Sequence, residues 1–273
     1  MRSLLHRSAK AILEFSLPTA ERLAGFRTPR GGYLPNRIRM LFGKYEAAEI
    51  RLMKQFLRPG QTIVDVGANV GYLTSFFARS AGPNGKVLAF EPNPNIFSLL
   101  QENTARFTQV SAYNVALSNT SGELPLFIAG TDQSVGSFAR EYPATHVFYQ
   151  KSGILRSVAA KLVNGDEFLT QLEVKTIDIL KLDVEGWEVS ALNGLERTIA
   201  ASPRLTIFCE FNPSAQECAG WCRIDLVNWF LDRRFNLFRA RAGHLEPISL
   251  ASAGDFIDEV EPGRFATLFA TAE

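Results

Sequence analysis

The sequence predicts an α/β fold in which helices cover both faces of a mostly parallel β-sheet. Along its 273 residues, short apolar runs typical of buried strands alternate with amphipathic helical patterns, and this alternation produces parallel sheets. The first strand leads into a glycine-containing turn and then a helix. Four strand ends carry acidic residues, and ligands bind at the carboxyl ends of parallel strands. The sequence therefore predicts a ligand site at that edge of one large core.

The first strand, turn and helix suit a cofactor. The apolar run Thr62–Val64 precedes the turn Asp65–Gly71, and the helical pattern Tyr72–Ala78 follows it. Small residues in such a turn let backbone N–H groups approach a ligand beside the N-terminus of the helix. The motif therefore predicts a cofactor cradle.

The spacing of the glycines indicates which nucleotide this cradle would hold. Gly67 and Gly71 occupy positions 1 and 5 of the turn, whereas a dinucleotide fingerprint needs glycines at positions 1, 3 and 6. Asp65 would repel a pyrophosphate, but its charge suits a ligand with an ammonium or sulfonium group. Glu91 lies 20 residues after Gly71, where ribose hydroxyls need an acceptor. These residues favour S-adenosylmethionine over NAD.

The remaining elements continue the alternation. The second strand, Lys86–Phe90, leads into a helix with Asn93 as N-cap and Pro94 in its first turn. Pro125 cannot donate to a ladder, so residues 123–128 are predicted to form an edge or hairpin strand. The other predicted strands cover 110–117, 177–183 and 205–209, with short runs up to residue 269, and the other helices lie over 44–57, around 166–169, and over 187–199 and 224–231.

Composition divides the chain into an N-terminal basic helix and arm, residues 1–41, and a domain over residues 42–273. Residues 1–45 hold nine Lys or Arg residues against two Glu residues, a net charge of about +7. We interpret this part as a solvated basic surface, with contact to anionic glycans or the headgroups of a membrane as the alternative. Residues 129–163 are polar and irregular, and so long a segment in a compact domain predicts a lid or substrate loop.

The totals limit the partners and the compartment. A net charge of +1 gives no global electrostatic case for binding nucleic acid. Three cysteines provide no disulfide framework for a chain of this length, so the sequence predicts free thiols and a cytoplasmic location. No apolar run approaches the roughly 18 residues that a membrane span needs. We therefore expect a protein without transmembrane segments.

The strand ends supply the candidate catalytic groups. Because side chains alternate along a strand, Lys181, Asp183 and Glu185 share one side, which places a cation between carboxylates. Glu210 ends the next strand. Asp183 follows an apolar run where an unpaired charge would be costly, so we expect it to deprotonate a substrate hydroxyl or to hold a divalent metal such as Mg²⁺. Glu188 is expected instead to cap the following helix, and no dedicated metal-ligand set is assigned.

Four motifs together resemble the FkbM-type methyltransferase family. They agree with that family in order and spacing, and with flanking similarity before the first strand and after the fourth the resemblance covers residues 42–211. The motifs are VDVGANVG at 64–71, AFEPNP at 89–94, NVALS at 114–118 and LKLDVEGWE at 180–188.

The resemblance implies a class I methyltransferase fold with a Rossmann-like, seven-stranded sheet. It also implies methyl transfer from S-adenosylmethionine to oxygen, commonly a hydroxyl of a sugar in a glycan, glycolipid or natural product, so that the partner is a small-molecule or glycan acceptor. In this chain the cofactor would be held by Asp65, Gly67, Asn69 and Gly71 at its methionine part, by Glu91 at the ribose, and by Ala116 and Leu117 at the adenine. Asp183 would lie beside the transferred methyl group, with Lys181, Glu185 and Glu210 around the acceptor.

Two other functions compete with this one. A grouping of Lys, Asp and Glu also suits a methyltransferase that acts on RNA ribose, and the basic N-terminus favours it. The net charge and the absence of an Asn-Pro-Pro-Tyr motif for base amines oppose it. The second alternative is a catalytically silent binding module that keeps the fold and holds a glycan or a partner. An NAD-dependent oxidoreductase ranks last because of the glycine spacing.

Overall fold

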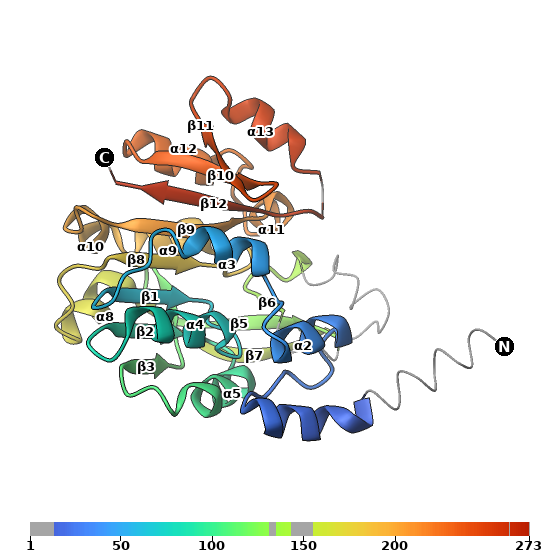
Figure 1. The fold of residues 1–273 in the computed structure, drawn as a ribbon. Helices are drawn as coiled ribbons and strands as arrows, with labels where there is room; N and C mark the ends of the chain where they lie inside the picture. The colour runs from blue at the N-terminus through green and yellow to red at the C-terminus, as the bar shows by residue number, and fades with distance from the viewer. Residues whose placement is uncertain (1–13, 131–134, 143–154, 262, 273) are drawn as a thin grey trace.

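The structure is a computed structural model that describes residues 14–130, 135–142, 155–261 and 263–272. The strands of its main sheet are β1 (Thr62–Val66), β2 (Lys86–Phe90), β3 (Val110–Tyr113), β8 (Ile179–Leu182), β9 (Thr206–Phe211), β10 (Asn236–Arg241), β11 (His244–Ile248) and β12 (Ala266–Thr271). They lie in the order β11-β10-β12-β9-β8-β1-β2-β3 (Figure 1). The five from β9 to β3 run parallel, and β12, β10 and β11 pair antiparallel at the other side. The predicted mostly parallel α/β sheet is confirmed.

The sheet has one strand more than the seven expected. β11 pairs with β10, and Arg241 lies opposite His244. The two residues between them, Ala242 and Gly243, have φ angles of 49° and 82°, the left-handed geometry of a tight hairpin turn. Of these two turn residues, glycine is usual at positive φ and alanine is not. Only Gly243 therefore indicates a hairpin turn in the sequence.

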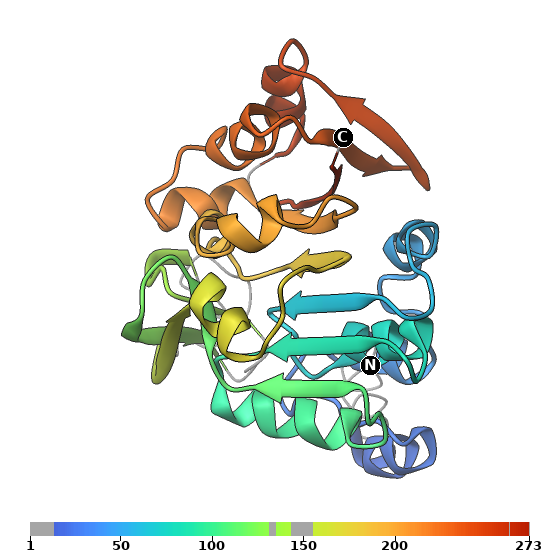
Figure 2. The same cartoon turned by 90° about the vertical axis from the view of Figure 1, so that its left-hand side faces the viewer.

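Helices cover both faces of the main sheet, as Figures 1 and 2 show together. Alternate residues of each strand enter different cores, so that Val64 and Leu88 lie on one side and Ile63 and Val87 on the other. The first side is covered by α8 (Gly165–Gln171), α9 (Glu188–Asn193), α10 (Glu196–Ala200), α12 (Asp225–Asp232) and α13 (Ala253–Glu259), and the second by α3 (Ala47–Met53), α4 (Tyr72–Ala81) and α5 (Pro94–Thr104).

A second, four-stranded sheet corrects two expectations. It consists of β4 (Ala116–Ser118), β7 (Leu155–Asn164), β5 (Gly122–Ala129) and β6 (Gly136–Ser137), in that order. The run 110–117, predicted as one strand, is divided between β3 and β4 in different sheets. Residues 155–163, predicted to be irregular, belong to β7, whose mixture of charged, small and apolar residues hides its strand character. Residues 131–134 and 143–154 of the predicted lid lie outside the described residues.

The place of Pro125 agrees with its chemistry. β5 pairs with β7 along its whole length, but β6 pairs only with Phe127 and Ile128 of β5. Among the described residues, Pro125 therefore lies in a part of β5 whose second edge has no paired strand, which suits a residue without an N–H group.

The helix predicted over 187–199 is two helices, α9 and α10, separated at Gly194. A Cβ atom at Gly194 would lie 1.9 Å from the carbonyl oxygen of Ser118, so the chain passes too close to β4 for any side chain. The buried carboxylate of Asp166 accepts hydrogen bonds from the backbone N–H groups of Arg197 and Thr198 at 2.9 and 2.8 Å. It thereby satisfies the free N-terminus of α10.

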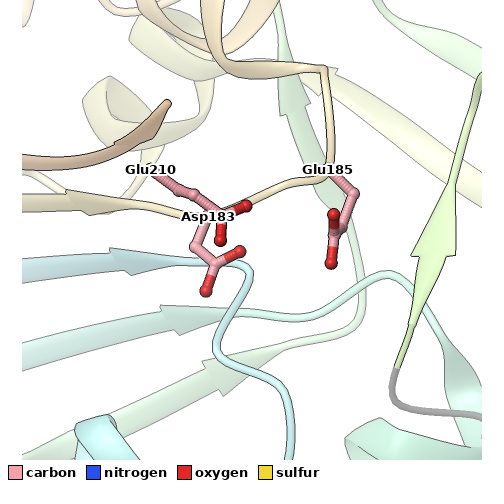
Figure 3. Close-up of side chains that lie close together, drawn as sticks. All are labelled: Asp183, Glu185 and Glu210. Carbon is pink, nitrogen blue, oxygen red and sulfur yellow. The ribbon is translucent and has the colours of Figure 1, made fainter. Parts of the chain in front are cut away.

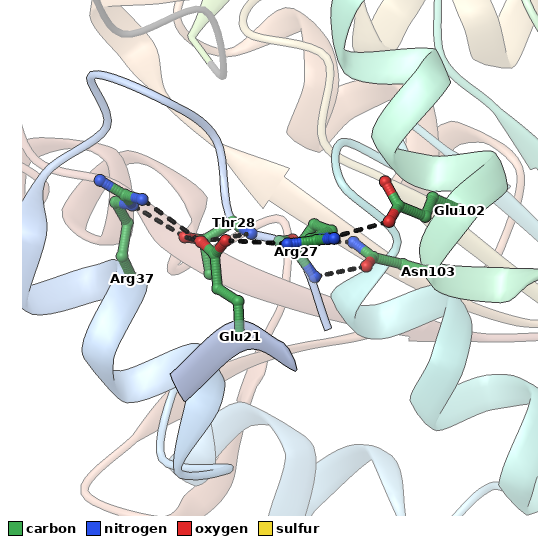
Figure 4. A network of polar contacts seen from close by, with 6 residues as sticks. All are labelled: Glu21, Arg27, Thr28, Arg37, Glu102 and Asn103. Carbon is green, nitrogen blue, oxygen red and sulfur yellow. Dashed lines mark hydrogen bonds and ion pairs between the residues drawn. The ribbon is translucent and has the colours of Figure 1, made fainter. Parts of the chain in front are cut away.

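The N-terminal arm is fixed to the rest of the chain by a polar network (Figure 4). Residues 14–24 are helical, and α2 (Leu34–Leu41) forms the end of the arm. The buried Glu21 accepts a hydrogen bond from the backbone N–H of Thr28 at 3.1 Å and from Arg37 at 3.3 Å. Arg27 donates to Glu102 of α5 at 2.9 Å. Its backbone N–H donates to Asn103 of the same helix at 2.6 Å.

Candidate active site

A cavity of about 1030 Å³ lies at the carboxyl ends of the parallel strands. The glycine turn after β1, the ends of β2, β8 and β9, the start of β4, the segment 135–142 and the N-terminal arm contribute to its walls. Nine of the eleven predicted site residues line it: Gly67, Asn69, Glu91, Ala116, Leu117, Lys181, Asp183, Glu185 and Glu210. Asp65 and Gly71 are not among the described lining residues.

Gly67 allows the loop that carries Asp183 to pass directly over the turn. Its φ angle is 75°, and a Cβ atom there would lie 1.8 Å from the backbone carbonyl oxygen of Asp183. The backbone N–H of Asp183 donates to the carbonyl of Val66 at 3.2 Å. The glycine turn and Asp183 are therefore built as one unit.

Gly71 lies behind the turn. Its φ angle is 81°, and a Cβ atom there would lie 2.8 Å from Leu100 Cδ1 of α5. The glycine thus lets the first turn of α4 pack against α5, and its contact with the cofactor stays a prediction.

Glu91 is held at both carboxylate oxygens. The backbone N–H groups of Asn69 and Asn93 donate to Oε2 and Oε1 at 2.9 and 2.8 Å. Asn69 has a φ angle of 51°, a left-handed conformation that asparagine tolerates. Burial raises the pKa of the Glu91 carboxyl to about 7. Each oxygen keeps a lone pair that can accept a hydrogen bond from a hydroxyl in the cavity.

Asp65 is fully buried and does not lie at the mouth of the cradle, where the sequence suggested it. It belongs to β1 and shares the side of Ile63, which faces α4. Its Oδ2 atom accepts a hydrogen bond from Thr74 of α4 at 2.6 Å, and its Oδ1 atom lies 3.6 Å from the Lys181 ammonium. The charge of Asp65 is therefore directed to a lysine and not to a ligand.

Lys181 lies between two carboxylates, Asp183, which the alternation along β8 predicted beside it, and Asp65 of β1, which it did not predict. Its Nζ atom is 3.6 Å from Asp65 and 3.5 Å from Asp183, and it donates to the carbonyl of Gly67 at 2.8 Å. Asp183 and Asp65 raise the pKa of Lys181 despite its burial. The ammonium group therefore stays charged and ties the glycine turn to Asp183.

Three carboxylates converge at the ends of β8 and β9 (Figure 3). Asp183, Glu185 and Glu210 each offer an oxygen atom within 4.8 Å of the others. Burial, and next the charge of Asp183, raise the pKa of Glu185 to about 8 and that of Glu210 well above its ordinary value. Because like charges this close cannot all ionise, the group holds protons at neutral pH. Such a set can exchange protons with a hydroxyl, and oxygen sets of this kind also bind divalent cations.

Glu188 orders the loop between β8 and α9. It is fully buried, and its Oε1 atom accepts hydrogen bonds from the backbone N–H groups of Val184 and Gly186 at 3.0 and 3.3 Å. Burial raises the pKa of its carboxyl to about 7. The carboxylate thus satisfies backbone donors of the loop ahead of α9 and none that an N-cap of this helix would bind, so the capping role predicted for it is corrected.

Four further residues reach the site without a clear sequence signal. Ser137 Oγ donates to the backbone carbonyl of Glu185 at 2.7 Å. The Tyr142 hydroxyl accepts a hydrogen bond from Asn212 Nδ2 at 2.8 Å. The Phe138 ring lies beside Trp187, with the ring centroids 4.9 Å apart. The only hint of these contacts was the cluster of Ser, Phe and Tyr in a segment without periodicity.

Two predictions that concern the whole chain, free thiols and the absence of membrane spans, can be compared with the described residues. Cys209, Cys218 and Cys222 are free thiols, as predicted. Within the described part of the chain, none of the helices has the length and apolar character needed to cross a bilayer.

Known proteins resemble this chain in sequence. The family model described as the methyltransferase FkbM domain matches residues 65–238. Hexuronic acid methyltransferase AglP of Haloferax volcanii is 31% identical over 167 residues, which are 60% of this chain and 61% of that protein. The 2-O-methyltransferase NoeI of Sinorhizobium fredii is 22% identical over 147 residues, 52% of this chain and 60% of that protein. The chain thus spans about three fifths of the length of these relatives.

Among solved structures, the precorrin-6y C5,15-methyltransferase of Geobacter metallireducens aligns with a TM-score of 0.48 at 13% identity, over 91% of this chain and 94% of that one.

Proposed function

Because the chain belongs to the FkbM methyltransferase family, we propose that it transfers a methyl group from S-adenosylmethionine to a hydroxyl group of a sugar. The observation that supports this most is the composition of a single cavity. At one strand end it contains Glu91, an acid suited to ribose hydroxyls, and at others it contains Lys181 and three clustered carboxylates. A cofactor site and an acceptor site can therefore lie side by side in this one cavity.

The residues of the cofactor part fit S-adenosylmethionine. This cofactor supplies a methyl group bound to a positively charged sulfur. Glu91 would accept hydrogen bonds from the ribose hydroxyls with its remaining lone pairs. Ala116 and Leu117, both buried in β4, supply an apolar wall for adenine. The carboxylate of Asp183 gives the cavity a negative charge that favours a sulfonium over a neutral ligand.

Asp183 is the best-placed acceptor for the proton of the substrate hydroxyl. Its side chain is 35% exposed, whereas that of its partner Lys181 is 7% exposed, so the carboxylate can reach a ligand while the lysine orients it. Asp183 takes the hydroxyl proton on a carboxylate oxygen. Glu185 and Glu210, which hold protons at neutral pH, donate hydrogen bonds to neighbouring oxygens of the acceptor. Most of the rate acceleration of methyl transfer comes from holding the hydroxyl oxygen in line with the methyl group.

The names of two relatives support oxygen as the acceptor atom and a sugar as the acceptor. One relative is named for hexuronic acid and the other as a 2-O-methyltransferase. A sugar also suits the site, because it offers several adjacent hydroxyls to carboxyl groups that lie within 4.8 Å of one another.

Calorimetry followed by a transfer assay tests the proposal. We expect S-adenosylmethionine, and not NAD, to bind with a Kd of about 1–100 μM. Glu91→Gln should weaken that binding, and the exposed Glu167→Gln should not. Asp183→Asn should lower kcat about 100-fold with labelled cofactor and a hexuronic acid or neutral sugar as acceptor, far more than it weakens cofactor binding. Absence of cofactor binding would overturn the proposal, and binding without transfer to any hydroxyl would favour a binding module.

A further inference from the structure

The segment 135–142 is attached directly to the loop that carries Glu185. Ser137 Oγ donates to the Glu185 carbonyl at 2.7 Å and accepts a hydrogen bond from the backbone N–H of Ala139 at 3.1 Å. Phe138 packs on Trp187 two residues beyond Glu185. Phe138 and Tyr142 both line the cavity. The segment therefore forms one wall of the acceptor region.

Tyr142 reaches the side chain of the same glutamate. Tyr142 is 8% exposed and Asn212 is 5% exposed. Asn212 Nδ2 donates to the Tyr142 hydroxyl at 2.8 Å, so the hydroxyl uses a lone pair there and keeps its proton to donate. That proton is directed to the carboxyl group of Glu185, with which the hydroxyl forms a hydrogen bond. Asn212 is itself fixed, because its Oδ1 atom accepts from the backbone N–H of Ala215 at 3.2 Å.

Glu185 needs such support for two reasons. Its φ angle is 50°, a strained conformation for a residue other than glycine. Its carboxyl group also faces the charged or titratable groups of Asp183, Glu188 and Glu210, with Lys181 as the neighbouring cation. With protons shared in this cluster, the Glu185 carboxyl group can turn to several neighbouring oxygens unless a donor holds it in one orientation.

We propose that Tyr142 is a positioning residue whose hydroxyl, oriented by Asn212, holds the Glu185 carboxyl group in place at the acceptor hydroxyl. The inference rests on the proposed methyl transfer, because Glu185 acts on the acceptor only in that reaction. It makes the segment 135–142 part of the catalytic machinery and not only a cover over the cavity.

A double-mutant cycle tests this coupling. Tyr142→Phe removes only the hydroxyl, and we expect it to lower kcat about tenfold with an unchanged Kd for S-adenosylmethionine. In a Glu185→Ala background the same change should cause no further loss, since the group that Tyr142 holds is gone. Unchanged kcat in the single variant, or losses that multiply in the double variant, would overturn the proposal.

Matched variants separate positioning from folding. Tyr113→Phe removes a hydroxyl outside the cavity lining and should leave kcat unchanged. Asn212→Ser keeps a side chain that can cap α11 (Pro213–Cys218) but loses the donor to Tyr142, so it should lower kcat in the same direction. If Tyr142→Phe does not fold, Asn212→Ser takes its place in the cycle.

An infrared measurement tests the contact without any acceptor. The carboxyl stretching band that disappears in Glu185→Ala should shift in Tyr142→Phe and stay in place in Tyr113→Phe. This readout holds even if the wild-type protein methylates no sugar hydroxyl, which would overturn the proposed function alone. A Glu185 band that is identical in wild type and Tyr142→Phe would overturn the positioning role.

Discussion

The Lys181 ammonium lies 3.6 Å from Asp65 Oδ1 and 3.5 Å from Asp183 Oδ2, so a buried acid supports the residue proposed as the base through one shared cation. Asp65 is fully buried and has no other group that can neutralise it among the described residues. Lys181 is therefore needed for folding as well as for the orientation of Asp183.

Lys181→Met should destabilise the protein by about 3–5 kcal/mol, because it leaves the Asp65 carboxylate buried and unpaired. Asp65→Asn in the same chain should restore part of the loss, since it removes the orphaned charge. Urea denaturation measures both, with the exposed Lys175→Met as the control. A loss below about 0.5 kcal/mol, the usual range for surface changes, would show that Asp65 finds another partner.

Gly67→Ala should reduce both stability and turnover, because the new Cβ atom would lie 1.8 Å from the Asp183 carbonyl oxygen. Gly82→Ala is the matched control. Gly82 also has a positive φ, 68°, with ψ −177°, but nothing lies within 4 Å of a Cβ atom there, so this change should cost about 1–3 kcal/mol of backbone strain without a steric clash. Equal effects of both variants on urea denaturation and kcat would mean that the loop carrying Asp183 moves freely.

The stability of the protein without ligands should fall as the pH rises from about 5 to 8. Burial raises the pKa of Glu46, Glu91 and Glu188 to about 7 and that of Glu185 to about 8, whereas an unfolded chain has these groups near 4.3. Between the two values the folded state holds more protons, so the free energy of unfolding decreases with pH. Urea denaturation at several pH values checks this, and Glu188→Gln should flatten the curve. A stability that rises over this interval contradicts the prediction.

Methyl transfer should persist in the presence of EDTA. Although Asp183, Glu185 and Glu210 have the spacing of a metal site, the Lys181 ammonium lies 3.5 Å from Asp183 and would repel a cation there, and protons on the two glutamates remove their charge. A transfer assay after dialysis against the chelator gives the answer. Loss of activity that Mg²⁺ restores would instead assign these carboxylates as metal ligands.

Local signals predicted the parts of the fold that depend on neighbouring residues. β1, the glycine turn and α4 follow from an apolar run, glycines and helical spacing, and Asn93 caps α5 as its type and the following proline indicated. Strand alternation also placed Lys181 beside Asp183. Extended to Asp65, which belongs to β1 and not to the turn, the same alternation directs this side chain toward α4.

The contacts that sequence reasoning missed join residues far apart in the chain. Tyr142 and Asn212 are 70 positions apart, and Ser137 and Glu185 are 48 apart. A tyrosine in a polar segment has no local pattern that names such a partner. The division of 110–117 between two sheets is likewise decided by packing, since both halves have the same apolar character.

The network around Glu21 limits how far the protein can be shortened at its N-terminal side and still keep the cavity. Tyr33, Arg37 and Met40 of the arm line the cavity, and Arg37 is held by Glu21. A shortened protein that starts at residue 42, the boundary suggested by composition, would lack one wall of the cavity. It would also leave Glu102 and Asn103 of α5 without the partners that Arg27 gives them. Engineering of this protein should therefore retain the helix over 14–24, although the family model begins only at residue 65.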